Sequence, residues 1–161
     1  MAIRRNMPGL TDIRLCGSKI MAFVEPESIL ERLDIRRVIS TDKAPAALGP
    51  YSQGVQAGEF LYVSGQIPVD PATGEIPGDI SLQAKRSLEN LKAVIEAGGY
   101  RLSDVVKTTV FAANISDFAA INAVYAEYFP KEAPARSFVA VKDLPKGVGV
   151  EIEAVAWRKK Q

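Results

Sequence analysis

The feature that most constrains the fold is a strict alternation of side chains near the carboxyl end, over residues 148–157. Successive side chains of a β-strand point to opposite faces of the sheet, so this alternation predicts a strand with two different faces. One face is apolar and holds Val148, Val150, Ile152, Ala154 and Ala156. The other face carries two carboxylates, because Glu151 and Glu153 are two residues apart. We therefore expect a strand with an apolar face and an acidic face.

Hydrophobic periodicity and Gly/Pro punctuation predict the remaining elements. Five further strands are expected, at residues 38–40, 54–57, 60–64, 105–113 and 136–141. Two helices are expected, one at 81–97 that Gly98 and Gly99 end, and one at 117–129 that Ser116 caps. Residues 65–78 read as a long loop. The predicted class is α+β, with a six-stranded sheet and the order β-β-β-α-β-α-β-β.

The number of helices is small for a sheet of this size. Two helices cannot cover both faces of six strands, so we expect both on one face. The other face then has to be buried elsewhere, and copies of the chain in a symmetric ring are the simplest solution.

The amino-terminal part, residues 1–37, differs from the domain expected at 38–161. It has scattered arginines and no clear period, and we expect it to be partly disordered, with a short amphipathic helix at 26–34. A weak organelle-targeting peptide within residues 1–20, or a chain start at Met7 or Met21, is an alternative interpretation.

Composition excludes several classes of function. The chain has no histidine, so devices of the Ser-His-Asp and Cys-His kind cannot be built. Its net charge is +1, which gives no electrostatic case for nucleic acid or an anionic membrane. Cys16 is the single cysteine, so no internal disulfide forms and a metal site is not expected. No apolar run approaches the roughly 18 residues of a membrane span.

Arg136 is the first candidate for chemistry. It follows Pro134 at the expected start of a strand, where its guanidinium can bind one carboxylate with two parallel hydrogen bonds. If residues 136–141 and 146–157 form an antiparallel hairpin around 142–146, Arg136 lies opposite Glu151. On spacing alone, a simple cross-strand ion pair is the more ordinary interpretation.

Three other residues stand out, each with an ordinary alternative. Tyr51 lies in the Pro/Gly loop 44–54, where it could close over a small ligand or be a packed aromatic. Asn122 lies on the second helix and by itself indicates little. Phe138 is on the face of Arg136, where packing is its default role.

Six motifs occur in an order that resembles one known family. They are Ala-Pro-Ala-Ala-Leu-Gly-Pro-Tyr-Ser-Gln-Gly (44–54), Val-Ser-Gly-Gln-Ile-Pro (63–68), Val-Val-Lys-Thr-Thr-Val (105–110), Asn-Ala-Val-Tyr-Ala-Glu-Tyr-Phe (122–129), Pro-Ala-Arg-Ser (134–137) and Val-Glu-Ile-Glu-Ala (150–154). The chain resembles the Rid (YjgF/RidA) family of enamine/imine deaminases, also known as the endoribonuclease L-PSP family. The resemblance covers about residues 38–161.

The resemblance implies a chorismate-mutase-like fold in a homotrimer, with three sites in clefts between subunits. It implies hydrolysis of 2-imino acids, typically 2-iminobutanoate and 2-iminopropanoate, to 2-oxo acids and ammonia. The family needs no cofactor and no metal. A cytoplasmic enzyme is expected, or an organellar one if residues 1–20 target the chain.

Site residues are implied position by position. Arg136 matches the arginine that grips the substrate carboxylate, and Glu151 matches the acid that positions the attacking water. Residues that match the lining of the substrate cleft are Tyr51, Ser64, Gly65 and Asn122. Phe138 stands where many relatives have cysteine, so thiol-based regulation cannot operate there, and the pocket is expected to be smaller or more apolar.

Two other kinds of function stay open. Some members of the family are associated with ribonuclease activity or translation inhibition, which the near-neutral charge and missing histidine disfavour. A non-catalytic trimer could instead bind 2-oxo acids at Arg136 without turnover.

Overall fold

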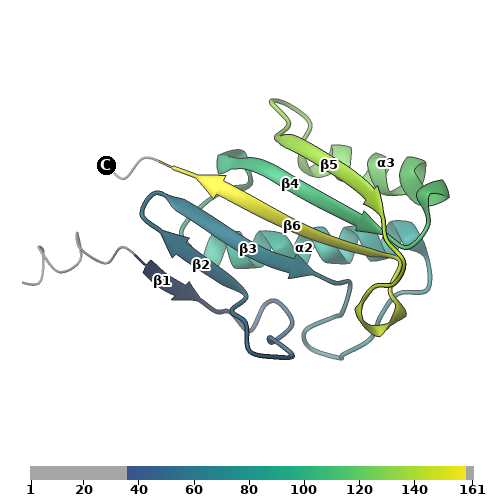
Figure 1. Ribbon diagram of the computed structural model, residues 1–161, viewed down its shortest axis with the longest axis horizontal. Coiled ribbons are helices and arrows are strands. Elements are labelled where there is room, and N and C mark those ends of the chain that lie inside the picture. Colours follow the sequence, from purple (N-terminus) through teal and green to yellow (C-terminus); the bar gives the residue numbers. More distant parts are fainter. Residues whose placement is uncertain (1–35, 159–161) are drawn as a thin grey trace, which may run out of the picture. The chain divides into compact units, whose positions relative to one another are not determined.

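A computed structural model describes residues 36–158, the part of the chain discussed from here on (Figure 1). Its strands are β1 (Arg36–Ile39), β2 (Gly54–Ala57), β3 (Phe60–Gln66), β4 (Val105–Ala112), β5 (Ala135–Ala140) and β6 (Val150–Trp157). Its helices are α2 (Ile80–Ala97) and α3 (Phe118–Tyr128), with 3-10 turns η1 (Leu102–Asp104), η2 (Ile115–Asp117) and η3 (Pro145–Gly147). The extension expected at 1–37 lies outside the described residues except for its last two, and so does the helix expected at 26–34.

The strands form one mixed sheet in the order β1-β2-β3-β6-β4-β5. All neighbours are antiparallel except β4 and β5, which run parallel. The predicted α+β class, the order of elements and the six-stranded sheet are confirmed. The long loop is shorter than expected at its start, because β3 continues to Gln66.

Both helices lie behind the sheet in Figure 1, as predicted, and the topology explains why. Helix α2 connects β3 to β4, and α3 connects β4 to β5, so both crossovers advance across the sheet in the same direction. Crossovers between parallel strands are almost always right-handed. Two crossovers of the same hand and direction place their helices on the same face, which leaves the other face open.

The expected hairpin between residues 136–141 and 146–157 is wrong. Strand β5 pairs only with β4, at the edge of the sheet, whereas β6 lies between β3 and β4. The physical reason is burial. Four residues of β6 are buried, namely Val150, Ile152, Ala154 and Ala156, so this strand takes a central position. The exposed pattern of β5 suits an edge.

Helix α2 supplies much of the core. Its fully buried apolar side chains contact the sheet and are Ala84, Leu88, Leu91, Val94 and Ile95. The Asp79 side chain caps its first turn by accepting from the backbone N–H groups of Ser81 and Leu82. For α3 the predicted Ser116 cap is wrong, because η2 precedes the helix and Asp117 enters it with helical dihedrals and no side-chain cap.

The open face carries an apolar band. Val38, Val55, Tyr62 and Val155 lie side by side across four neighbouring strands. Tyr62, on the inner strand β3, is 50% exposed, and Val38, on the edge strand β1, is 53% exposed, so the band leaves large apolar side chains open to solvent. Within residues 36–158, no helix has the length and apolarity needed to cross a membrane.

Candidate active site

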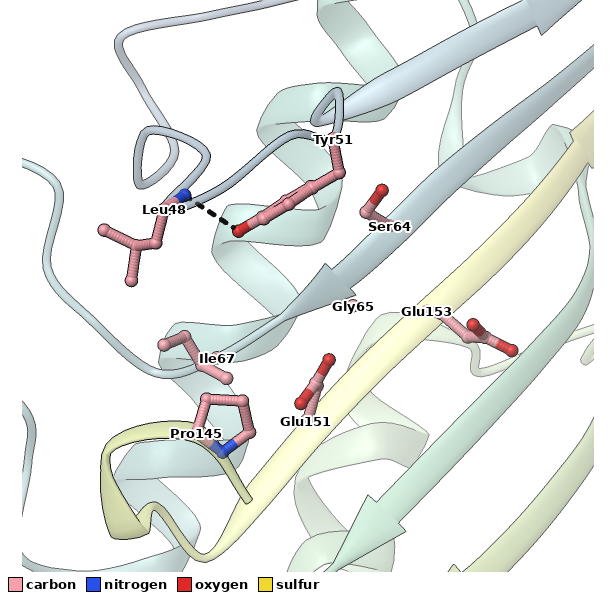
Figure 2. A pocket seen from close by; sticks show the side chains of 8 residues that line it. All are labelled: Leu48, Tyr51, Ser64, Gly65, Ile67, Pro145, Glu151 and Glu153. Atoms are coloured by element: carbon pink, nitrogen blue, oxygen red, sulfur yellow. Dashed lines mark hydrogen bonds between the residues drawn. The ribbon is translucent and has the colours of Figure 1, made fainter.

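A pocket of about 460 Å³ lies at one end of the open sheet face (Figure 2). It is formed where β3 ends and β6 begins, and the loop before β2 and the turn η3 close its sides. The residues that line it are Leu48, Tyr51, Ser64, Gly65, Ile67, Pro145, Glu151 and Glu153. This lining contains two carboxylates and no basic side chain.

Gly65 makes room for the Glu151 carboxylate. The pairing of β3 with β6 is irregular between Val63 and Gln66, so Gly65 bulges beside Glu151. A Cβ built on residue 65 would overlap the carboxylate of Glu151. A side chain other than hydrogen at this position would therefore displace the acid, so the close approach of Gly65 is what leaves the Glu151 carboxylate in its place.

Burial of the Glu151 side chain raises the pKa of its carboxyl group, and the negative charge of Glu153 raises that pKa further. Within residues 36–158, no hydrogen-bond donor and no basic side chain counteracts these two effects. A carboxylate with a raised pKa and no fixed partner is a stronger base than an ordinary glutamate and is suited to exchanging protons with water or substrate.

The loop that carries Tyr51 is held by side-chain amides and hydroxyls. The Tyr51 hydroxyl accepts from the Leu48 backbone N–H at 3.2 Å, and the ring stays 51% exposed over the pocket (Figure 2). Ser64 Oγ donates to the Ser52 carbonyl at 2.7 Å. The buried Gln53 Nε2 lies 2.8–3.1 Å from three loop carbonyls, those of Thr41, Ala44 and Pro45.

Arg136 lies on the opposite face of the sheet from this pocket. In the parallel register it stands beside Thr108, whose side chain is fully buried on the helix side. Glu151 stands beside Phe111 on β4, three residues further on and therefore on the other face. The guanidinium Nη2 of Arg136 donates to Asn122 Oδ1 at 2.8 Å, and its Cζ lies 4.5 Å from the centre of the Tyr125 ring.

Two phenylalanines lie next to the Arg136 guanidinium group. Phe138 shares the face of Arg136, as expected, and packs edge-to-face on Phe118 with ring centres 4.9 Å apart. The Phe118 ring centre is 5.9 Å from the guanidinium carbon. An apolar wall made of Phe118 and Phe138 thus borders the cation.

The seven predicted site residues fall into two groups. Tyr51, Ser64, Gly65 and Glu151 meet in the pocket. Arg136, Asn122 and Phe138 lie together on the helix side, where hydrogen bonds and aromatic contacts connect them. No group of three or more acidic or cysteine side chains that could hold a metal occurs in the described part of the chain.

Comparison with known proteins identifies the family. The profile of the Endoribonuclease L-PSP family matches residues 41–158. The chain belongs to this family, which is the one its motifs indicate.

Three relatives in the family are close. A RutC family protein from Haemophilus influenzae is 56% identical over 127 residues, which are 76% of this chain and 98% of the relative. The 2-iminobutanoate/2-iminopropanoate deaminase of Escherichia coli is 52% identical over 126 residues, again 76% and 98% of the two chains. The crystal structure of E. coli TdcF with bound serine aligns with a TM-score of 0.75 at 50% identity, over 76% of this chain and 99% of that one.

The sequence prediction of the site omitted several contributors. Glu153 lines the pocket, and the alternation of β6 could have found it, because it shares the face of Glu151. No sequence signal pointed to Gln53, whose side-chain amide holds the Tyr51 loop, or to the ring of Tyr125. Their roles depend on contacts between segments that are distant in the sequence.

Proposed function

We propose that the chain hydrolyses 2-imino acids such as 2-iminobutanoate and 2-iminopropanoate to 2-oxo acids and ammonia. The observation that carries the proposal is the Glu151 carboxylate, held over Gly65 in a pocket with no cation of its own. A substrate with a carboxylate and an electrophilic carbon needs a proton acceptor near the carbon and a cation at its acid group. Arg136 offers the cation with a donor fork of the right shape.

We further propose that the two halves come from different subunits of a homotrimer. The sheet separates Arg136 from Glu151 within one chain, so one ligand cannot bridge them there. The open face carries exposed apolar side chains that favour association with another copy, and Phe60, Tyr62, Val139 and Trp157 are each at least 41% exposed. A ring of head-to-tail contacts would present the arginine of each subunit to the pocket of the next.

The chemistry then needs only these side chains and one water. Arg136 binds the substrate carboxylate, and the iminium carbon faces the Glu151 carboxylate. Water adds its oxygen to this carbon while Glu151 accepts one of its protons, which gives a carbinolamine. The protonated Glu151 returns the proton to nitrogen, the C–N bond breaks with its electron pair leaving on ammonia, and loss of the hydroxyl proton gives the 2-oxo acid. Fixing the reactants and moving the proton are both effective sources of rate.

Two relatives support this choice of substrate. The E. coli relative is named for deamination of 2-iminobutanoate and 2-iminopropanoate. TdcF holds serine in its crystal, which is a small amino acid with a free carboxylate. A small 2-imino acid is of similar size and carries the same acid group.

The test is the loss of 2-iminobutanoate produced in situ by a threonine dehydratase. We expect Arg136→Ala to lower kcat/KM at least about a hundredfold, because two charge-assisted hydrogen bonds to the substrate are lost. Arg158→Ala is the matched control, because Arg158 also stands over a tyrosine, with its Cζ 5.7 Å from the centre of the Tyr100 ring. Arg158 is not one of the residues that line the pocket. That variant should keep the parent rate.

The outcomes separate the candidate functions. Activity in the parent and in Arg158→Ala that disappears in Arg136→Ala supports the deaminase. An inactive parent that still binds 2-oxobutanoate through Arg136 indicates a ligand-binding protein instead. A folded Arg136→Ala variant with the parent rate rules out this arginine as the carboxylate site.

A further inference from the structure

The tyrosine beneath Arg136 is fixed at both of its ends. Tyr125 is only 5% exposed, and its backbone belongs to α3. Its hydroxyl is 2.8 Å from Thr108 Oγ1, which is fully buried on β4. The ring therefore connects the helix to the sheet, and it has little freedom to rotate or shift.

This fixed ring lies directly under the guanidinium group. The Arg136 Cζ is 4.5 Å from the ring centre, well inside the range of a cation–π contact. Thr108, the anchor of the ring, is the residue that pairs with Arg136 in the β4–β5 register. The same short stretch of sheet thus sets the position of the arginine and of the ring beneath it.

Asn122 completes the support from the same helix. It lies three residues before Tyr125, on the same side of α3, and its Oδ1 accepts one guanidinium N–H at 2.8 Å. One edge of the guanidinium is engaged by this amide and one face by the ring. The remaining N–H donors stay available for a ligand carboxylate.

Burial raises the pKa of the Tyr125 hydroxyl, and its hydrogen bond with Thr108 opposes this shift only in part. The phenol therefore loses its proton less readily than that of an ordinary tyrosine. Its contact with Arg136 is one between a cation and a ring face, and it leaves the positive charge of the arginine available to the ligand.

We propose that Tyr125, anchored by Thr108, is a positioning residue that sets the direction of the Arg136 fork for binding the substrate carboxylate. This inference rests on the proposed function, and it adds residues that do not themselves touch the substrate. Its general prediction is a defect in carboxylate binding with little change in the chemical step.

The chain provides a matched control for the experiment. Tyr100 is 6% exposed, donates its hydroxyl to the Glu59 carbonyl, and also has an arginine, Arg158, over its ring. Neither of these two partners, Glu59 and Arg158, is a site residue. Removing the ring at residue 100 or at residue 125 causes a similar loss of core packing, and only the second change removes support from the site.

The experiment measures KM and kcat for 2-iminobutanoate, and the Kd of 2-oxobutanoate by calorimetry, in folded protein. We expect Tyr125→Leu to raise KM and Kd about tenfold, with kcat within about threefold of the parent. Tyr125→Phe keeps the ring and should restore most of the binding. Tyr100→Leu should leave both constants unchanged. Equal binding by Tyr125→Leu and Tyr100→Leu would overturn the proposal.

A conservative pair of variants covers the case in which Tyr125→Leu does not fold. Thr108→Val and Tyr125→Phe each remove one hydroxyl of the anchoring hydrogen bond and keep the core volume. We expect each to raise the Kd by about two- to fourfold, and the double variant to be no worse than either single one, because both act through one bond. Additive effects, or none at all, would contradict the proposal.

The calorimetric measurement also separates this inference from the proposed function. If the parent binds 2-oxobutanoate but does not deaminate, the proposed function fails and the positioning role can still be measured. If the parent deaminates and its binding ignores Tyr125, only the positioning role fails.

Discussion

The two faces of the sheet hold their functional groups in opposite ways. On the open face, the Glu151 carboxylate occupies the space that Gly65 leaves by having no side chain, and no donor within residues 36–158 fixes it. On the helix face, Arg136 is placed by contacts, with Asn122 at its edge and Tyr125 beneath it. A group that exchanges protons benefits from having no fixed partner, whereas a group that binds a carboxylate benefits from a fixed direction.

The same comparison bears on the proposed association of subunits. A six-stranded sheet with helices on one face separates the acid from the arginine and leaves apolar side chains such as Tyr62 exposed. We propose that contact between the open face of one subunit and a neighbouring subunit covers these apolar side chains and also brings an arginine to the acid.

The sharpest test of the open face is Gly65→Ala. The added Cβ would overlap the far end of the Glu151 side chain, which can rotate away without moving the backbone. We expect deamination to fall about a hundredfold while the melting temperature stays near that of the parent, because a small misplacement of a catalytic group is enough for such a loss. Activity and thermal unfolding are measured on the same preparation.

Gly78→Ala is the matched control, because a Cβ there meets no atom within 4 Å. It should change neither activity nor stability. A Gly65→Ala enzyme with the parent rate would show that the close approach of Gly65 and Glu151 is unimportant for catalysis.

On the helix face, Phe138→Cys should have a smaller effect. The change removes the ring that packs on Phe118 but leaves the Asn122 and Tyr125 contacts of Arg136 in place. We expect a KM within about fivefold of the parent and a loss of about 1–2 kcal/mol in the free energy of unfolding, since the ring is half-buried. Denaturant unfolding and steady-state kinetics measure the two effects, and a hundredfold loss of activity would contradict this division of roles.

Glu153→Gln should have the smallest effect, a shift in the pH dependence of kcat/KM. Burial and the charge of Glu153 both raise the pKa of Glu151, so removing that charge lowers the pKa. The ionised base then persists to more acidic pH, and the acid limb of the kcat/KM profile moves to lower pH. A limb that moves to higher pH, or does not move, would exclude Glu153 as a neighbour that tunes Glu151.

Local patterns in the sequence were enough to predict the elements. The period of α2 and the alternation of β6 each report the environment of their own residues, and both predictions are confirmed. The acidic face of β6 also indicates Glu151 as a candidate for chemistry. Such patterns depend on neighbours in the chain, which a sequence displays directly.

The arrangement of strands could not be predicted in this way. The sequence suggested β5 and β6 as a hairpin, but β4, which lies some twenty residues earlier, intervenes between them. The error put Arg136 beside Glu151 within one chain, whereas the register puts them on opposite faces. Tyr125 was overlooked for the same reason, since its importance comes from contacts with β4 and β5.

The most direct test of the two-subunit site is complementation between inactive variants. Arg136→Ala and Glu151→Gln chains are co-expressed in equal amounts, and the mixed oligomers are assayed for loss of 2-iminobutanoate. Each homo-oligomer should be inactive, whereas random mixing should rebuild about a quarter of the sites from the intact arginine of one chain and the intact glutamate of its neighbour. Recovery of roughly that fraction of parent activity is the result we expect. Mixed oligomers that form but stay as inactive as the separate variants would contradict a site shared between subunits.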